Sequence, residues 1–334
     1  MKEAKTWFFR PATQILSPVP VDILAWAARC LRSAVAGWGG ADQSGAMNPY
    51  SFFVEAHARA FREAETLRPG ARAEPLPAPS ADAPVALLFS PHPDDECIVG
   101  GLPLRLRRES GWRVVNAAVT LGSLQSRRAE RLEELEEACG RLGFDLVPAG
   151  GGGLEGIRLE TRRNRPHHWT HAVNAIGALL LEYRPAAVFL PHAVDGNPTH
   201  MGVHALVRHA LHRAGEAVRC IAVETEFWSP MEDPNCLVES TTIDVARLVE
   251  ALACHRGEVS RNPYHLRLPA WMMDTVRRAG ERLGGPGSRP PDFLFGTAYG
   301  IRLWTERRLR EALPEGAFVS ASEAPGPLLE RLLG

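Results

Sequence analysis

A run of ionisable residues at the end of an apolar stretch constrains this chain most. Residues 85–89 read Val-Ala-Leu-Leu-Phe, and the segment Ser90-Pro91-His92-Pro93-Asp94-Asp95-Glu96 follows at once. One imidazole and three carboxylates within five residues repel one another and lose hydration unless a cation or a substrate compensates them. Because folding does not require such a cluster, a buried strand that ends in it predicts a metal site.

Strands and helices alternate along the chain after Val85. The predicted strands are Val85–Phe89, Val114–Val119, Phe144–Val147, Ala186–Leu190 and Val218–Val223. The predicted helices are Ser126–Leu142, His167–Tyr183, Met201–Ala214, Asp244–Cys254 and Ala270–Leu283. This alternation is typical of an α/β fold in which helices cover both faces of a mostly parallel sheet.

Residues 1–84 are expected to form a helical appendage that ends in a proline-rich linker, and residues 85–334 the main domain. One helix is predicted over 21–36, and a second begins after Asn48 as N-cap with Pro49 at the first helical position. The second helix carries an aromatic stripe, Tyr50, Phe53, His57 and Phe61, which favours docking against the main domain or a second subunit. A homo-oligomer is therefore an expectation, and amphipathic membrane contact by the appendage is the less favoured alternative.

Composition excludes several partners. The chain has 38 Lys and Arg against 39 Asp and Glu, a net charge of -1, so no global field favours nucleic acid or an anionic membrane. Its six cysteines show no CxxC spacing and lie scattered in a chain too long to need disulfides. Reduced thiols, and the expected absence of a secretory signal or membrane span, predict a cytoplasmic protein.

A second loop with chemistry follows the strand at 186–190. It runs from Pro191 to His200, and in a doubly wound sheet the carboxyl ends of the strands share one edge. Both loops should therefore meet there, where His92, Asp95 and His200 supply the nitrogen and oxygen ligands that zinc accepts. Fe²⁺ or another divalent ion suits the same set. Asp94 is then free to act as general base on the metal-bound water.

Two alternatives to these assignments stay open. An Asp-Asp pair after a proline is often a turn or a helix cap, and a single histidine at a helix start is often structural. His204 lies four residues after His200, so the two could grip a metal as an HxxxH pair on one helical face. Because Val203, Val207 and Leu211 surround it, we expect His204 to be a hydrogen-bonded core residue.

The string Pro91–Glu96, together with Asn197-Pro198-Thr199-His200, resembles the PIG-L/LmbE family of zinc-dependent N-acetylglucosamine deacetylases. The resemblance extends from about Val85 to Trp304, and residues 1–84 have no counterpart in it. It implies a Rossmann-like fold, zinc ligands at His92, Asp95 and His200, and a general base at Asp94. It also implies hydrolysis of an acetamide on an amino sugar.

Other positions take part in the same resemblance. The segment Arg131-Leu132-Glu133-Glu134 resembles the family's arginine-plus-glutamate helix, which makes Arg131 a candidate substrate anchor. The segment 190–192 and Asp195 resemble the approach to the second motif, and the late helix ends in His255. His192 is a further candidate for substrate binding, as is Tyr299, because residues 296–300 stand where family members often place a loop that lines the pocket.

One departure concerns the proton donor. Many family members read His-Pro-Asp-His in the second motif, whereas this chain has Asn197 first and Thr199 third. An asparagine can donate a hydrogen bond to an oxyanion but cannot shuttle a proton. Asn197 is therefore predicted to stabilise the oxyanion, and His255, His192 or Asp94 itself to return the proton to the leaving amine.

These observations predict a metal-dependent amidohydrolase that removes acetyl from an N-acetylated amino sugar or glycoconjugate. In this hypothesis zinc-bound water attacks the acetamide and Asp94 takes its proton. One alternative is cleavage of another amide, such as a sugar–cysteine conjugate or a nonsugar acyl amine. The other is a noncatalytic metal-bearing interaction protein, although a structural metal site needs no spare base.

Overall fold

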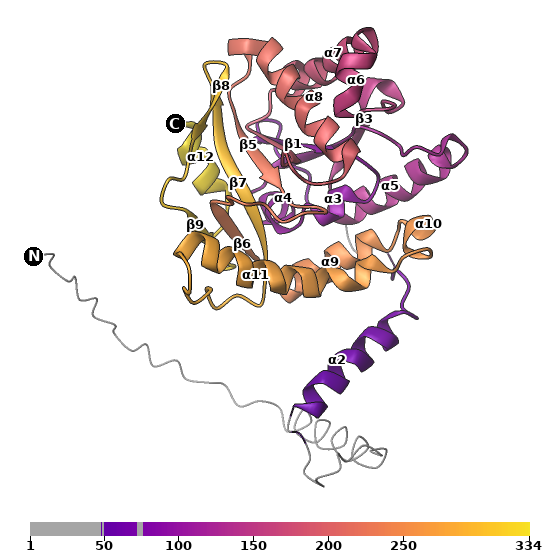
Figure 1. The fold of residues 1–334 in the computed structure, drawn as a ribbon, viewed down its shortest axis with the longest axis vertical. Helices are drawn as coiled ribbons and strands as arrows, with labels where there is room; N and C mark the ends of the chain where they lie inside the picture. The colour runs from indigo at the N-terminus through magenta and orange to yellow at the C-terminus, as the bar shows by residue number, and fades with distance from the viewer. Residues whose placement is uncertain (1–47, 49, 72–75) are drawn as a thin grey trace, which may run out of the picture. The chain divides into compact units, whose positions relative to one another are not determined.

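The computed structural model of this chain describes residues 48, 50–71 and 76–334 (Figure 1). The chain divides into two compact units, 1–61 and 62–334. The predicted helix at 21–36 lies outside the described residues. The second predicted helix is α2 (Ser51–Ala64), and Asn48 lies at its start, where its Oδ1 accepts a hydrogen bond from Tyr50 N at 3.0 Å. A domain boundary at 84/85 stays a prediction.

The second unit is built on a nine-stranded sheet. Its strands are β1 (Val85–Ser90), β2 (Arg113–Ala118), β3 (Asp145–Pro148), β4 (Ala187–Pro191), β5 (Cys220–Thr225), β6 (Cys236–Ser240), β7 (Phe295–Thr305), β8 (Arg308–Glu311) and β9 (Ala317–Val319). Their order is β3-β2-β1-β4-β5-β7-β6-β9, with β8 paired to β7. The pairs among β3, β2, β1, β4 and β5 are all parallel, as is β6 with β9, whereas every pairing of β7 is antiparallel. The predicted mostly parallel α/β fold is confirmed.

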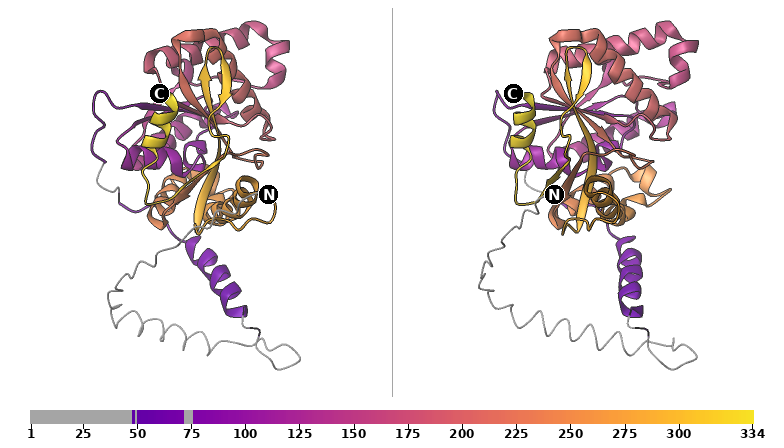
Figure 2. Two further views of the ribbon diagram at one scale, coloured as in Figure 1. Left: turned by 90° about the vertical axis from the view of Figure 1, so that its left-hand side faces the viewer. Right: turned by 60° about the vertical axis from the view of Figure 1, so that its left-hand side comes forward.

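Helices cover both faces of this sheet, as the views in Figures 1 and 2 show. Alternate residues of β1 point to opposite faces, so Ala86 and Leu88 join one core and Leu87 and Phe89 the other. The first core contains residues from α3 (Asp95–Ile98), α4 (Gly101–Glu109), α5 (Arg128–Leu142), α9 (Thr242–Leu252), α11 (Leu268–Gly284) and α12 (Gly326–Leu333). The second contains residues from α7 (Pro166–Tyr183) and α8 (Pro198–Ala214). The short helices α6 (Leu159–Asn164) and α10 (Arg256–Val259) complete the α-helical elements described.

The part after Glu226 departs most from the sequence prediction. Residues 296–300, expected in a loop that lines the pocket, lie inside the eleven-residue strand β7. Strands β6, β8 and β9 and helix α12 had no predicted counterpart. The strands in this part of the chain show little alternation of apolar and polar residues. The reason is that β7 is buried over most of its length and that β6, β8 and β9 are short.

The described part of the predicted linker is held against the main domain. Arg107 donates from Nη2 to the carbonyl oxygen of Pro77 at 2.6 Å, and Pro84 O accepts the backbone N–H of Arg113 at 2.9 Å. The five cysteines that the structure describes are free and buried, as expected for reduced thiols. Within the described residues, no helix has the length and apolar character needed to span a membrane.

Candidate metal centre

Two strand ends bring the candidate ligands together. Strands β1 and β4 are parallel neighbours, with Leu87 opposite Val188, so both chains leave the sheet at the same edge. The loop after β1 carries His92 and leads into α3, whose first residue is Asp95. The loop after β4 leads into α8, whose third residue is His200. The predicted convergence at the carboxyl edge is confirmed.

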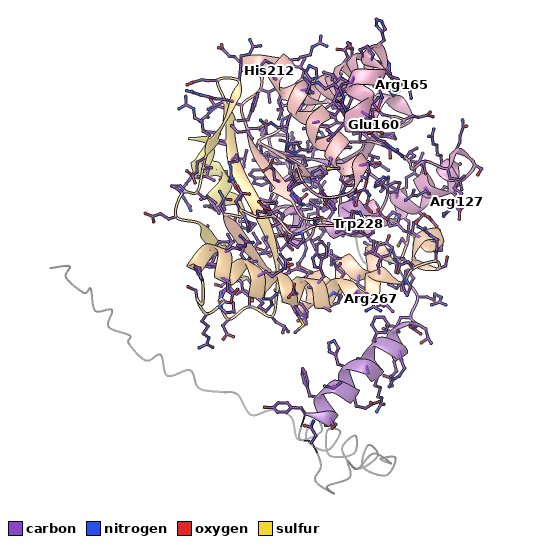
Figure 3. All side chains as sticks on the ribbon, in the orientation of Figure 1. Arg127, Glu160, Arg165, His212, Trp228 and Arg267 are labelled. Atoms are coloured by element: carbon purple, nitrogen blue, oxygen red, sulfur yellow. The ribbon has the colours of Figure 1, made fainter. Side chains whose placement is uncertain are left out.

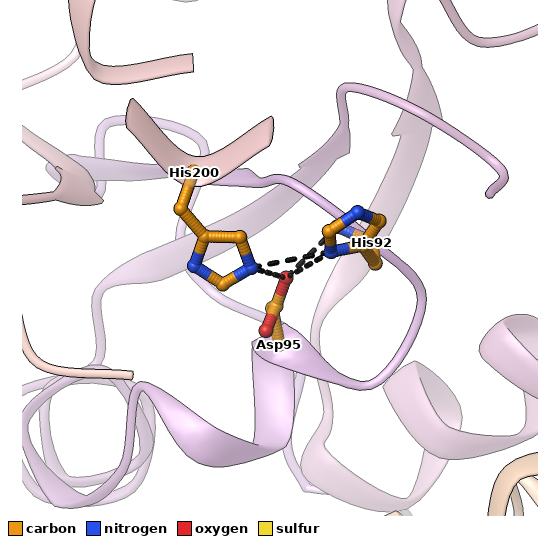
Figure 4. Close-up of side chains that lie close together, drawn as sticks. All are labelled: His92, Asp95 and His200. Carbon is orange, nitrogen blue, oxygen red and sulfur yellow. Dashed lines mark hydrogen bonds and ion pairs between the residues drawn. The ribbon is translucent and has the colours of Figure 1, made fainter. Parts of the chain in front are cut away.

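His92, Asp95 and His200 form a compact triangle of ligand atoms (Figure 4). The distance from His92 Nδ1 to His200 Nε2 is 3.2 Å, from His92 Nδ1 to Asp95 Oδ2 3.4 Å, and from His200 Nε2 to Asp95 Oδ2 3.3 Å. Asp95 and His200 are buried, whereas the His92 side chain is 23% exposed. The centre is therefore reached from solvent on the side of His92.

The charges in this triangle favour a cation. Burial raises the pKa of Asp95, but His200 and His92 outweigh it and hold the pKa well below its usual range. Burial lowers the pKa of His200, but the charges of Asp95 and Asp195 reverse this and raise it to about 10. Two buried carboxylates thus hold a positive charge at His200, which a proton or a metal ion can supply.

Asp195, which was predicted only to resemble the approach to the second motif, makes an ion pair with His200. Its Oδ1 lies 3.0 Å from His200 Nδ1, and both side chains are fully buried. Its Oδ2 accepts the backbone N–H of Trp228 at 2.9 Å. A carboxylate on the far nitrogen of a histidine sets the tautomer that presents the other nitrogen to a metal. An aspartate in the loop just before His200 is therefore the sequence signal that could have identified Asp195.

Asp94 occupies a strained position next to the ligands. Its φ of 115° lies in a region that side chains other than glycine rarely adopt. Its backbone N–H donates to Glu96 Oε2 at 2.9 Å, and its Oδ2 accepts the hydroxyl of Tyr264 at 2.6 Å. Burial and the neighbouring charge of Asp95 raise the pKa of Asp94 to about 7, the range useful for a general base at neutral pH.

Sequence reasoning left Glu96 without a role and missed Tyr264. Both hold Asp94, one through its backbone and one through its carboxylate. Tyr264 lies 170 residues from Asp94 in a short 3-10 turn, Tyr264–Arg267, that carries no motif of its own. Nothing in the local sequence could have identified this contact.

His255 is placed behind the site rather than in it. It is fully buried, and its Nε2 lies 2.7 Å from Glu96 Oε1. Burial lowers its pKa, but the Glu96 carboxylate raises it above the ordinary value, so the pair is held as an ion pair. His255 therefore supports the glutamate that holds Asp94, and this geometry does not favour its expected role as a proton donor to substrate.

Glu96, Cys97 and His255 form a second group of possible metal ligands among the described residues. Burial and the charge of Glu96 raise the pKa of the Cys97 thiol well above its usual value. The protonated Sγ donates to Glu96 Oε1 at 3.1 Å. Glu96, Cys97 and His255 thus form a hydrogen-bonded cluster next to Asp94.

Asn197 is the N-cap of α8. Its Oδ1 accepts the backbone N–H groups of Thr199 and His200 at 2.8 and 3.5 Å. The side-chain NH₂ group remains as the donor that could face an oxyanion. The capping bonds also fix the start of the helix that carries His200.

Tyr299 and His192, two residues expected to contact substrate, contact backbone atoms of the protein instead. Tyr299 is fully buried in β7, where its hydroxyl donates to Val99 O at 2.7 Å and accepts the N–H of Leu102 at 3.0 Å. His192 is also buried, and its Nε2 lies 2.9 Å from Ser229 O. Both side chains hold backbone near the site, so this geometry does not favour the predicted contact with substrate for either residue.

Arg131 lies under the first loop. Its Nη2 donates to Pro93 O at 3.1 Å and lies 3.8 Å from Glu258 Oε1. A Cβ atom at Gly122, where φ is 86°, would clash with its guanidinium. Arg131 thus positions the loop that carries Asp94, and whether it also anchors substrate stays a prediction.

His204 does not join the metal ligands. It is buried, and its Nδ1 lies 2.8 Å from Pro191 O. Glu224 Oε1 is 3.6 Å from the same nitrogen. The expectation of a hydrogen-bonded core histidine is confirmed, and the contact of His204 Nδ1 with backbone does not favour the HxxxH ligand pair.

The donor set fits a tetrahedral divalent metal. Zinc lies about 2.0–2.1 Å from nitrogen and oxygen ligands, which places neighbouring ligands of a tetrahedron about 3.3–3.4 Å apart. The three edges of the His92, Asp95 and His200 triangle are 3.2–3.4 Å. The contact between Asp195 Oδ1 and His200 Nδ1 is a further feature of such sites, because a carboxylate there orients the ligand histidine.

Comparison with known proteins agrees with the two motifs. Residues 87–211 match the family model described as PIG-L: GlcNAc-PI de-N-acetylase. His92, Asp94, Asp95 and His200 lie inside the matched range, whereas His255 and Tyr264 lie beyond it. No curated protein matches the chain in sequence.

Several solved structures resemble the chain in fold. The conserved protein TT1542 from Thermus thermophilus has 21% identity and a TM-score of 0.49, covering 65% of this chain and 94% of its own. N,N'-diacetylchitobiose deacetylase from Pyrococcus horikoshii has 18% identity and a TM-score of 0.48, covering 75% and 92%. The 4-carboxy-2-hydroxymuconate hydratase GalB from Pseudomonas putida has 15% identity and a TM-score of 0.49, covering 65% and 95%.

Proposed function

We propose that this protein is a metal-dependent deacetylase that hydrolyses the acetamide of an N-acetylated amino sugar or glycoconjugate. The observation that carries the proposal is that a candidate metal-binding triangle and a candidate general base lie next to each other at one edge of the sheet. His92, Asp95 and His200 form a metal-sized triangle, and Asp94 stands beside it with a pKa raised to about 7. The match of residues 87–211 to a de-N-acetylase family model supports the reaction class.

His92, Asp95 and His200 would hold the metal, for which Zn²⁺ is the first candidate and Fe²⁺ another. When bound, such an ion polarises a carbonyl and lowers the pKa of water toward neutrality. Asp195 keeps His200 in the tautomer whose Nε2 faces the metal. The Phe227 and His200 rings make a T-shaped contact, with their centroids 4.9 Å apart, and His200 is fully buried.

Asp94 moves the protons. Because its Oδ2 accepts the Tyr264 hydroxyl, we assign proton transfer to Oδ1. The carboxylate takes one proton from the attacking water as the C–O bond forms. It then returns that proton to the amide nitrogen as the C–N bond breaks, which gives a free amine and acetic acid, and the acid ionises to acetate at neutral pH. Asn197 cannot supply this proton, and His255 is buried behind Glu96.

The NH₂ group of Asn197 is the candidate donor to the developing oxyanion. An oxyanion donor of this kind contributes about 10²–10³ to kcat in well-studied hydrolases. Asn197→Ala should therefore lower kcat, but it also removes the helix cap that positions His200. Asn197→Asp keeps the cap acceptor and loses the donor, so it separates the two contributions.

The test is release of acetate from a panel of acylated amines by purified protein loaded with Zn²⁺ or Fe²⁺. The panel contains N-acetylglucosamine glycosides, a sugar–cysteine conjugate and nonsugar N-acetyl amines. Acetate from the sugars that disappears in Asp94→Asn supports the proposal. Turnover confined to nonsugar amines would replace the substrate class, and stoichiometric metal without turnover on any amide would favour a noncatalytic metal-bearing protein.

A further inference from the structure

A pocket of about 180 Å³ lies on the protein surface beside the candidate metal centre. Its walls are largely apolar, and four aromatic rings contribute to them: Phe227, Trp228, Tyr264 and Trp271. Ile98, Leu252 and Leu268 complete the apolar wall. Figure 3 labels Trp228 and Arg267, two residues that line the same pocket from different parts of the chain.

Two of the wall residues touch the proposed catalytic machinery. Tyr264 donates its hydroxyl hydrogen to Asp94 Oδ2 at 2.6 Å, and the Phe227 ring makes a T-shaped contact with the His200 ring. Ile98, three residues after Asp95, ends the short helix α3. The pocket therefore adjoins the residues proposed to act on the scissile amide, with Tyr264 and Phe227 shared between its wall and those residues.

The chemistry of the wall selects an apolar group. Sugar hydroxyls that leave water need hydrogen-bond partners, and apart from Arg267 the wall consists of aromatic and aliphatic side chains, which offer few of them. A cavity of about 150 Å³ lined by Leu, Ile and Phe is large enough to bind benzene. The volume here thus suits one aromatic ring or a short alkyl chain, and it exceeds the methyl of an acetyl group.

We propose that this pocket binds a ring-sized apolar group of the substrate, attached next to the scissile amide. The proposal deepens the proposed function and rests on it, because it names the class of amide that the enzyme acts on. The apolar group can come from the acyl side of the amide or from the aglycone on the amine side. Both sources present the same surface to Trp228, Tyr264 and Trp271.

Binding of the products separates the two sources without requiring turnover. Isothermal calorimetry with the purified full chain compares phenyl with methyl β-glucosaminide for the amine side, and benzoate with acetate for the acyl side. We expect one of the two pairs to show at least a tenfold lower Kd for the aromatic member, since each methylene in an apolar pocket discriminates by about tenfold or more. Ratios below about twofold in both pairs would overturn the proposal.

Variants test whether the preference comes from this pocket. Trp228 is 66% exposed, so Trp228→Ala removes a wall of the pocket with little effect on the core. Phe318→Ala is the matched control, because Phe318 is 44% exposed on β9, the last strand of the sheet. The aromatic preference should fall at least threefold in Trp228→Ala and stay unchanged in Phe318→Ala.

Equal weakening of methyl and phenyl glycosides in Trp228→Ala would contradict the proposal. If Trp228 stacks on the sugar ring itself, Trp228→Ala weakens methyl and phenyl glycosides equally, and the proposal is wrong. Failure of the proposed function has a different signature. In that case no acylated amine is hydrolysed, while the aromatic preference and its loss in Trp228→Ala persist.

Discussion

Asp195 Oδ1 lies 3.0 Å from Nδ1 of His200, and neither side chain is exposed to solvent. The carboxylate leaves the opposite nitrogen of His200 facing Asp95 and His92. A ligand held in this way binds metal more tightly than a freely rotating imidazole.

The first prediction follows from this contact. Asp195→Asn should weaken metal affinity by about 10–100-fold, because the amide no longer stabilises the required tautomer. Competition with a chromophoric chelator measures the affinity. Asp274→Asn on α11 removes an exposed carboxylate and serves as control. Equal affinities in wild type and Asp195→Asn would contradict the assignment.

Asp94→Asn should separate metal binding from catalysis. The variant keeps all three ligands, so its metal content should equal that of the wild type, while kcat falls by about 10²–10⁴ because the general base is lost. His200→Ala should instead lose the metal. Elemental analysis together with acetate release distinguishes these outcomes, and a fully active Asp94→Asn would show that another group takes the proton.

The pH profile depends on Tyr264. Its hydroxyl bond to Oδ2 stabilises the ionised form of Asp94 and lowers the pKa of that carboxyl. Tyr264→Phe should therefore move the rising limb of kcat/KM to higher pH, with the largest loss of activity at low pH. A loss that is the same at every pH would assign Tyr264 a purely structural role.

Metal-free protein should lose stability as the pH rises from the unfolded-state pKa of Asp94 to its folded-state pKa. The pKa is about 7 in the folded state and 3.8 in the reference state, so between these values the folded protein binds a proton that the unfolded chain has released. The unfolding free energy of the wild type should fall relative to Asp94→Asn from about pH 4 to pH 7 and then run parallel to it. Urea unfolding at several pH values measures this difference, and a constant difference would refute it.

Glu96→Ala should destabilise the fold through His255. The substitution leaves a buried imidazolium without its carboxylate, which costs about 3–5 kcal/mol in comparable sites. Glu96→Gln keeps an acceptor for the N–H of Asp94 and should cost less. Thermal unfolding of the two variants tests the order, and equal melting temperatures of wild type and Glu96→Ala would show that the ion pair contributes nothing.

Local patterns predicted the parallel half of the molecule. The strands before Glu226 each combine a short apolar run with a loop and an amphipathic helix, and β1 to β5 lie within a few residues of their predicted ranges. The two motifs after β1 and β4 identified His92, Asp95 and His200, because adjacent parallel strands present their carboxyl ends at one edge. Tyr299 was misplaced because nothing in its short segment marks a buried antiparallel strand.

By itself, the sequence determined the α/β alternation and the residue types of the two loops, and it predicted separate roles for Asp94 and Asp95, since these depend on residue type and near neighbours. Tertiary structure alone decided that Tyr264 contacts Asp94 across 170 residues and that His255 lies behind Glu96. It also decided that Phe227 and Trp228 form an apolar wall beside the metal centre. These contacts join distant segments whose local sequences carry no record of one another, so packing has to bring them together before their chemistry can be recognised.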